Sequence, residues 1–110
     1  MIAVIAALSA ALAIGAGAFG AHGASSPQAA EWLRTGGFYQ LIHAVAALVV
    51  VRGASQPGIA AAMLGGAAIF AFTLYAMALG APKWLGAVTP VGGALMIGAW
   101  LVAAWRFSRF

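Results

Sequence analysis

The segment Gly36-Gly37-Phe38-Tyr39-Gln40-Leu41-Ile42-His43 places three hydrogen-bonding side chains at the start of an apolar stretch. Tyr39 precedes His43 by four residues and Gln40 precedes it by three, so on a helix all three side chains can lie on one face. The residues that follow, up to Val51, are all apolar. Polar side chains are costly at membrane depth unless they find partners. This segment therefore indicates where hydrogen-bonding partners on other helices are needed.

The composition of the chain is that of a membrane protein. Of its 110 residues, 65% are hydrophobic and 5% are charged, whereas a soluble domain carries about 25% charged residues. The five basic residues are scattered singly, without the clustering that nucleic-acid binding requires, so we expect no nucleic-acid partner. Cysteine is absent, which excludes disulfides, thiol catalysis and thiolate metal sites. We expect a single domain over residues 1–110.

Charged residues divide the chain into four long uncharged stretches. A helix needs roughly 20 apolar residues to cross the hydrocarbon core. We therefore predict an all-α membrane protein with four transmembrane helices near Ile2–Ala21, Phe38–Val51, Ile59–Leu79 and Gly86–Trp105. The first stretch has no Lys or Arg at its start, so we interpret it as a span and not as a signal peptide. Short turns around Gly53 and Pro82 predict an up-down antiparallel bundle.

A short interfacial helix is predicted between the first and second spans, within residues 25–37. A serine followed by Pro27 is typical of a helix start, and Gly36 and Gly37 predict its end. Glu31 and Arg34 are three residues apart and can pair on its surface. The second span would then have few apolar residues, about 21 Å of helix, which is short for a crossing.

Up-and-down connectivity brings the end of the first span, the start of the second, the end of the third and the start of the fourth to one side of the membrane. This side carries the candidate polar layer, which consists of His22, Tyr39, Gln40, His43, Tyr75 and Thr89. Since lipid offers these groups no partner, we expect hydrogen bonds between helices. His43 is expected to bond the first span near Phe19–Gly23, or Tyr75, or Thr89.

Three interpretations of this layer are open from the sequence. In the first, the layer is structural and sets the register of the helices. In the second, the protein is a transporter or a proton-linked factor that uses the layer around His22 and His43. In the third, these two histidines hold a metal or haem. Because no further ligand accompanies them, we expect neither a metal nor another cofactor.

The chain also lacks the residues of an enzyme and carries its charges unevenly. Glu31 is the only carboxylate side chain, and no nucleophile, base and acid set is present, so we expect no enzymatic activity.

One predicted side holds Arg52, Arg106 and Arg109, while the other holds two basic residues and the single acid. The positive-inside rule therefore predicts that both termini lie in the cytoplasm.

Several motifs along the chain resemble those of a known family. They are Gly17-Ala18-Phe19-Gly20-Ala21-His22-Gly23, Tyr39-Gln40 with His43-Ala44, Leu74-Tyr75, and Thr89-Pro90-Val91-Gly92-Gly93 with Trp100. The chain resembles the domain-of-unknown-function family 423, the YgdD-like small membrane proteins of bacteria. The resemblance implies a four-span protein of the bacterial inner membrane whose biochemical role is not established.

Two functions from different classes are consistent with the sequence. The first is a small structural or accessory membrane protein that works through helix–helix contacts among membrane lipids, as a homo-oligomer or in a larger membrane complex. The alternative is the transporter or proton-linked factor described above. Water access separates them, because a conduit needs polar residues through the full depth of the membrane.

Overall fold

The computed structural model describes residues 1–109, and in this part of the chain all regular structure is helical. Four helices are long and apolar enough to cross a membrane. The first three are α1 (Ile2–His22), α2 (Pro27–Gly53) and α3 (Pro57–Ala78). The fourth, Lys83–Phe107, consists of a short 3-10 helix η1 (Lys83–Ala87) followed by α4 (Thr89–Phe107). The chain is therefore an all-α membrane protein with four membrane-length helices.

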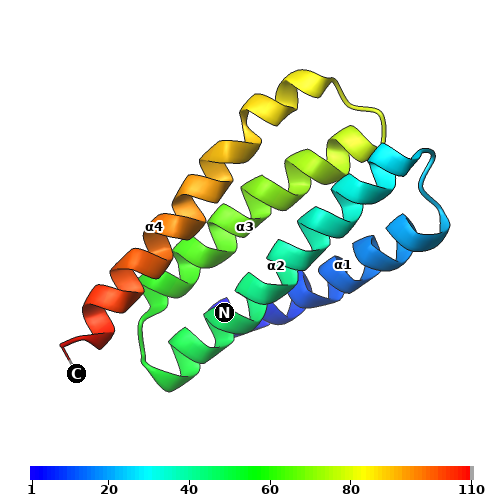
Figure 1. The fold of residues 1–110 in the computed structure, drawn as a ribbon. Helices are drawn as coiled ribbons and strands as arrows, with labels where there is room; N and C mark the ends of the chain where they lie inside the picture. Colours follow the sequence, from blue (N-terminus) through cyan, green and yellow to red (C-terminus); the bar gives the residue numbers. More distant parts are fainter. Residues whose placement is uncertain (110) are drawn as a thin grey trace.

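Successive helices run in opposite directions (Figure 1). At one end of the α1–α2 contact, Gly20 lies against Leu33, and further along Gly37 lies against the Ala13 carbonyl. The α3–α4 contact is equally close, since a Cβ added to Gly92 would lie 2.5 Å from the Gly66 carbonyl oxygen. Small residues thus allow the backbones of neighbouring helices to approach one another, as is common in membrane proteins.

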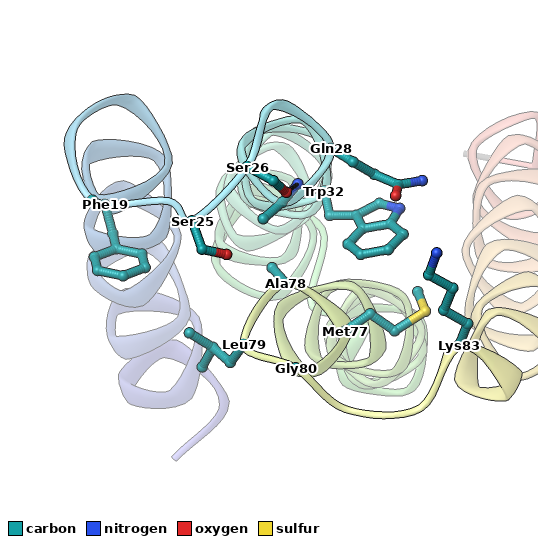
Figure 2. Close-up of a pocket in the computed structure, with 12 residues that line it drawn as sticks. Phe19, Ser25, Ser26, Gln28, Trp32, Met77, Ala78, Leu79, Gly80 and Lys83 are labelled. Atoms are coloured by element: carbon teal, nitrogen blue, oxygen red, sulfur yellow. Dashed lines mark hydrogen bonds between the residues drawn. The ribbon is translucent and has the colours of Figure 1, made fainter.

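The four helices do not close into a ring. Within residues 1–109, no Cα of α4 lies within 8 Å of a Cα of α1 or of α2. Seen end-on, α1 and α4 lie on opposite outer sides and α2 and α3 occupy the middle (Figure 2). The bundle is consequently open between α2 and α4, where α3 forms the floor.

The prediction of a separate interfacial helix was wrong, because α2 is one continuous helix of 27 residues. Its start is as expected, since the Ser26 side chain accepts a hydrogen bond from the Ala29 amide. The two glycines that were expected to end a helix instead lie inside α2, at its contacts with two neighbours. A Cβ at Gly36 would lie 2.7 Å from the Tyr75 ring, and one at Gly37 would lie 2.9 Å from the Ala13 carbonyl oxygen.

The early start of α2 changes the expected length of the second span. At about 1.5 Å per residue, α2 is roughly 40 Å long and crosses a bilayer with ease. His43 consequently lies deep within α2, and not one or two turns from its start. The expected pair on the first turns does form, with Arg34 and Glu31 2.6 Å apart on the exposed surface.

The half of the fold that contains Arg52 has an apolar core. Its buried residues are alanines, larger aliphatic residues and one methionine from all four helices, namely Ala6, Ala47, Val50, Ile59, Ala60, Met63, Leu64, Ala99 and Ala103. Alanine allows close helix packing but contributes little side-chain burial, so contact between backbones supplies much of the packing here. Buried polar side chains are confined to the other half and to the middle of the fold.

Candidate functional site

The first cross-helix bond of the polar region joins α3 to α2. The Tyr75 hydroxyl donates a hydrogen bond to the Gln40 side-chain carbonyl oxygen over 2.6 Å. Gln40 is 2% exposed, so its amide has little access to any partner outside the protein. Gly36 makes this approach possible, because the Tyr75 ring fills the space that a side chain at position 36 would occupy.

The second bond joins α4 to α2 through His43, which is 4% exposed. The Trp100 indole nitrogen donates to His43 Nε2 over 3.0 Å. Because an indole N–H can only donate, Nε2 must be the unprotonated nitrogen of the ring. Nδ1 therefore carries the proton and donates to the Tyr39 carbonyl oxygen 2.7 Å away, one turn earlier on α2. The two bonds together select the neutral Nδ1–H form of His43.

The third bond joins α3 to α4 through two threonines. The Thr73 and Thr89 hydroxyl oxygens are 2.6 Å apart. Thr73 also lies within hydrogen-bond distance of the Ile69 and Phe70 carbonyls, and Thr89 within 3.3 Å of the Leu85 carbonyl. Such bonds to the preceding turn, which for Thr89 lies in η1, keep a hydroxyl satisfied by the nearby backbone. We call the six residues of the three bonds the polar network: Gln40, His43, Thr73, Tyr75, Thr89 and Trp100.

Two of the residues predicted for the polar layer lie outside this network. His22 is exposed at the end of α1 and has no hydrogen-bond partner among residues 1–109. Tyr39 is 40% exposed, and its ring packs edge-on against Phe70 with the ring centroids 4.9 Å apart. Consecutive residues of a helix point in directions about 100° apart, so Tyr39 cannot share the buried position of Gln40.

The predicted partners of His43 were wrong, because its ring bonds Trp100 and the Tyr39 backbone. From the sequence, Trp100 was named within the motifs of the family resemblance and not as a partner of His43. The useful signal was present nonetheless: Trp100 lies inside the predicted last span, and an indole N–H at membrane depth has no water to bond and requires an acceptor. His43 is the buried imidazole that can supply one.

The network leaves no polar side chain in need of a partner. Within the described residues, every buried side-chain nitrogen and oxygen has a hydrogen-bond partner. The same part of the chain contains no group of three or more His, Asp or Glu residues placed to hold a metal ion. The hydrogen bonds of the network therefore fix how α2, α3 and α4 are rotated about their axes relative to one another. None of its side-chain hydrogen bonds reaches α1.

Comparison with known proteins identifies relatives along almost the whole chain. Residues 16–93 match the family model described as "Protein of unknown function (DUF423)". A UPF0382 membrane protein of Staphylococcus epidermidis is 35% identical, and the alignment covers 97% of this chain and 94% of the relative. UPF0382 membrane proteins of Haemophilus influenzae and Bacillus subtilis are 35% and 34% identical, over 90% of this chain and 86% and 89% of their own lengths. No solved structure matches the chain.

Proposed function

The chain belongs to the DUF423 family of membrane proteins of unknown function, and we propose that it is a small structural or accessory protein working through helix–helix contacts. The observation that carries this proposal is the complete internal pairing of the polar network. Every buried side-chain nitrogen and oxygen among residues 1–109 has a partner inside the protein, and bonds of this kind between helices hold them together. On this proposal the protein is not an enzyme.

The apolar half of the fold argues against the transporter alternative. Transport of a proton or a polar solute needs polar groups or water through the full membrane depth. Between the His43–Trp100 bond and the end of the bundle near Arg52, the buried residues are aliphatic or methionine side chains. A path along the polar network would therefore stop near the middle of the membrane.

The surface that we propose for partner contacts is the outer face of α1. In the apolar stretch that could span the membrane, 11% of the residues of α1 are buried inside the protein, compared with 44% of those of α2. The exposed face combines aliphatic residues such as Leu8 with small residues such as Ala11 and Gly15. This face carries no charge and is therefore compatible with a second copy of itself. We propose a homo-oligomer, built on α1 about a twofold axis.

The proposed location is the bacterial inner membrane with both termini in the cytoplasm. The ends of α2 and α4 on one side carry Arg52, Arg106 and Arg109. On the other side Arg34 is paired with Glu31, which leaves Lys83 as its unpaired basic side chain in the described part of the chain. This excess of basic residues favours the cytoplasmic side for the first group.

Single-cysteine crosslinking in native membranes tests the homo-oligomer, since the natural chain has no cysteine. The test position is Leu8→Cys on α1, which is 65% exposed, and the matched control is Leu101→Cys on α4, which is 66% exposed. Each lies six residues from the helix end on the same side of the membrane. We expect an oxidised dimer from Leu8→Cys and little from Leu101→Cys. Equal yields, or no dimer from either, would overturn the α1-mediated homo-oligomer.

A flux assay tests the remaining part of the proposal. The purified protein is reconstituted into vesicles with a pH-sensitive dye inside, and a pH step is applied. We expect the rate of proton entry to match that of empty vesicles. A faster rate that His43→Leu abolishes would overturn the structural proposal and support the proton-linked alternative.

A further inference from the structure

Three pockets that share lining residues form a groove from the end of the bundle towards its middle, along the opening between α2 and α4. We call it the α2–α4 groove; its floor is formed by α3, with Phe70, Leu74 and Met77. At its outer end lies a pocket of about 460 Å³, which Figure 2 shows between the start of α2 and the end of α3. Phe19 and Gly23 at the end of α1 also line this pocket, and Phe19 lies on the side opposite Lys83 (Figure 2).

The outer pocket combines polar and apolar groups. Gln28 and Trp32 from α2 point towards Lys83 at the start of η1 (Figure 2). Lys83 has no hydrogen bond or ion pair to another residue among 1–109, and Glu31, the only acidic side chain, is already paired with Arg34. The mouth of the groove therefore presents one free positive charge beside amide and indole donors.

The polar mouth passes directly into an apolar stretch. Trp32, Met77 and Lys83 line both the outer pocket and a second pocket of about 330 Å³, which continues along α3 and the start of α4. Phe70 in turn lines both this second pocket and a third of about 340 Å³. The third pocket ends at His43 and Trp100, whose hydrogen bond spans the opening from α2 to α4.

The length of the groove matches an acyl chain. From Trp32 to His43 the groove follows eleven residues of α2, or about 16 Å at 1.5 Å per residue. A membrane acyl chain occupies one leaflet, which is about 15 Å of hydrocarbon. A positive charge at the interface followed by a leaflet-deep apolar groove is the complement of a lipid with an anionic head and a long tail.

From this complementarity we propose that the α2–α4 groove is a specific binding site for an anionic phospholipid. Lys83 contacts the phosphate, Gln28 and the Trp32 indole provide hydrogen-bond donors to the head group, and one acyl chain lies over Phe70 and ends against Trp100. Basic residues at the membrane surface contribute about 1 kcal/mol each to anionic lipid binding, which corresponds to about fivefold in affinity.

Native mass spectrometry of the delipidated protein in detergent tests the head-group contact. Dioleoyl phosphatidylglycerol is titrated against the protein, with dioleoyl phosphatidylcholine as the neutral-headed comparison. We expect Lys83→Gln to weaken phosphatidylglycerol binding about fivefold and to weaken phosphatidylcholine binding by less, because the choline cation offsets the charge of its phosphate. The matched control is Arg52→Gln, an exposed basic residue at the opposite end. Equal effects of the two substitutions would show unspecific attraction by the net positive charge and would overturn the site.

A second pair of variants tests the acyl-chain part of the groove. A Cβ at Gly93 would lie 4.0 Å from the Phe70 ring, so the first carbon fits and the rest of a leucine would fill the groove. We expect Gly93→Leu to reduce binding of both lipids at least fivefold. Gly98→Leu is the control, because a Cβ at Gly98 meets no atom within 4 Å. Unchanged binding by Gly93→Leu, with helix content intact by circular dichroism, would overturn the proposal.

A soluble competitor separates a lipid site from a phosphate site. Glycerol phosphate carries a phosphate group, as a monoester, without an acyl chain. We expect millimolar glycerol phosphate not to displace phosphatidylglycerol, since most of the proposed contact area lies along the tail. Full displacement would show that the mouth binds phosphate alone, and the lipid assignment would then fail.

Discussion

The Trp100 indole nitrogen donates a hydrogen bond to Nε2 of His43 across the opening between α2 and α4. The Cα atoms of these two helices stay more than 8 Å apart throughout residues 1–109, so the long Trp100 side chain makes the connection that the backbones do not. The bond also determines the protonation state of His43, because the acceptor nitrogen must be free of hydrogen.

Removing either partner should therefore destabilise the protein by a similar amount. We expect His43→Leu and Trp100→Phe each to lower the free energy of unfolding by about 0.6–2 kcal/mol, the range for a hydrogen bond between membrane helices. The double variant should cost less than the sum of the two, since both remove the same bond. Steric-trap unfolding in bicelles measures all three values. Fully additive effects would show that the bond contributes nothing to stability.

The hydroxyl groups of Tyr75 and Tyr39 should contribute differently to the stability of the protein. Tyr75→Phe removes the donor to Gln40, an amide that is 2% exposed, and should lower the unfolding free energy by about 1–2 kcal/mol. Tyr39→Phe removes a hydroxyl that has no hydrogen bond within residues 1–109, so it should change stability by less than about 0.5 kcal/mol. The same unfolding assay compares the two variants. A larger loss from Tyr39→Phe would contradict the observed pairing.

Two glycines of α4 should respond oppositely to alanine. A Cβ at Gly92 would lie 2.5 Å from the Gly66 carbonyl oxygen and from the Phe70 nitrogen, so Gly92→Ala must push α3 and α4 apart. We expect a loss of about 1–3 kcal/mol, the usual cost of overpacking. Gly98→Ala meets no atom within 4 Å and should be neutral or slightly stabilising, because alanine favours the helix. Equal stability of both variants would show that the helices do not pack at Gly92.

The purified protein should contain neither haem nor stoichiometric metal. Both ring nitrogens of His43 are engaged, one by the Tyr39 carbonyl and the other by Trp100. A metal at His43 would have to displace one of these bonds, and His22 lies outside the network. Elemental analysis and an absorption spectrum check this expectation. A Soret band, or one metal ion per chain, would contradict it.

A reporter fused to the C-terminus should be active on the cytoplasmic side. Arg52, Arg106 and Arg109 lie at the end of the bundle where α4 ends, and Arg106 and Arg109 flank the Trp105 ring at 5.6 and 5.3 Å from its centroid. Fluorescent-protein and alkaline-phosphatase fusions report opposite sides of the membrane. Phosphatase activity without fluorescence would reverse the proposed orientation.

The sequence predicted which residues belong to much of the candidate site, but it did not predict which of them bond one another. The spacing of Tyr39, Gln40 and His43 marked the right stretch of α2, and up-and-down connectivity placed Tyr75 and Thr89 on the same side of the membrane. Which of these side chains meet depends on the rotation of each helix and on the distance between helices. Periodicity in an almost uniformly apolar chain does not encode that rotation, so Trp100 was not recognised as the partner of His43.

The glycines of α2 show the same limit in local structure. Gly36 and Gly37 were interpreted as a helix end because glycine has low intrinsic helix propensity. The tertiary structure needs them inside the helix, where Tyr75 and the Ala13 carbonyl leave no room for a side chain. Packing against two neighbouring helices outweighs a propensity of about 1 kcal/mol per residue.

The amino-acid sequence by itself determined that this is a membrane protein with four spans, because hydropathy and charge add up residue by residue along the chain. Only the tertiary structure decided that α2 is continuous, that the bundle is open between α2 and α4, and that His43 bonds Trp100. These features depend on contacts between residues far apart in the chain. Such contacts are settled by the close approach of small residues and by the few acceptors that a buried donor can reach.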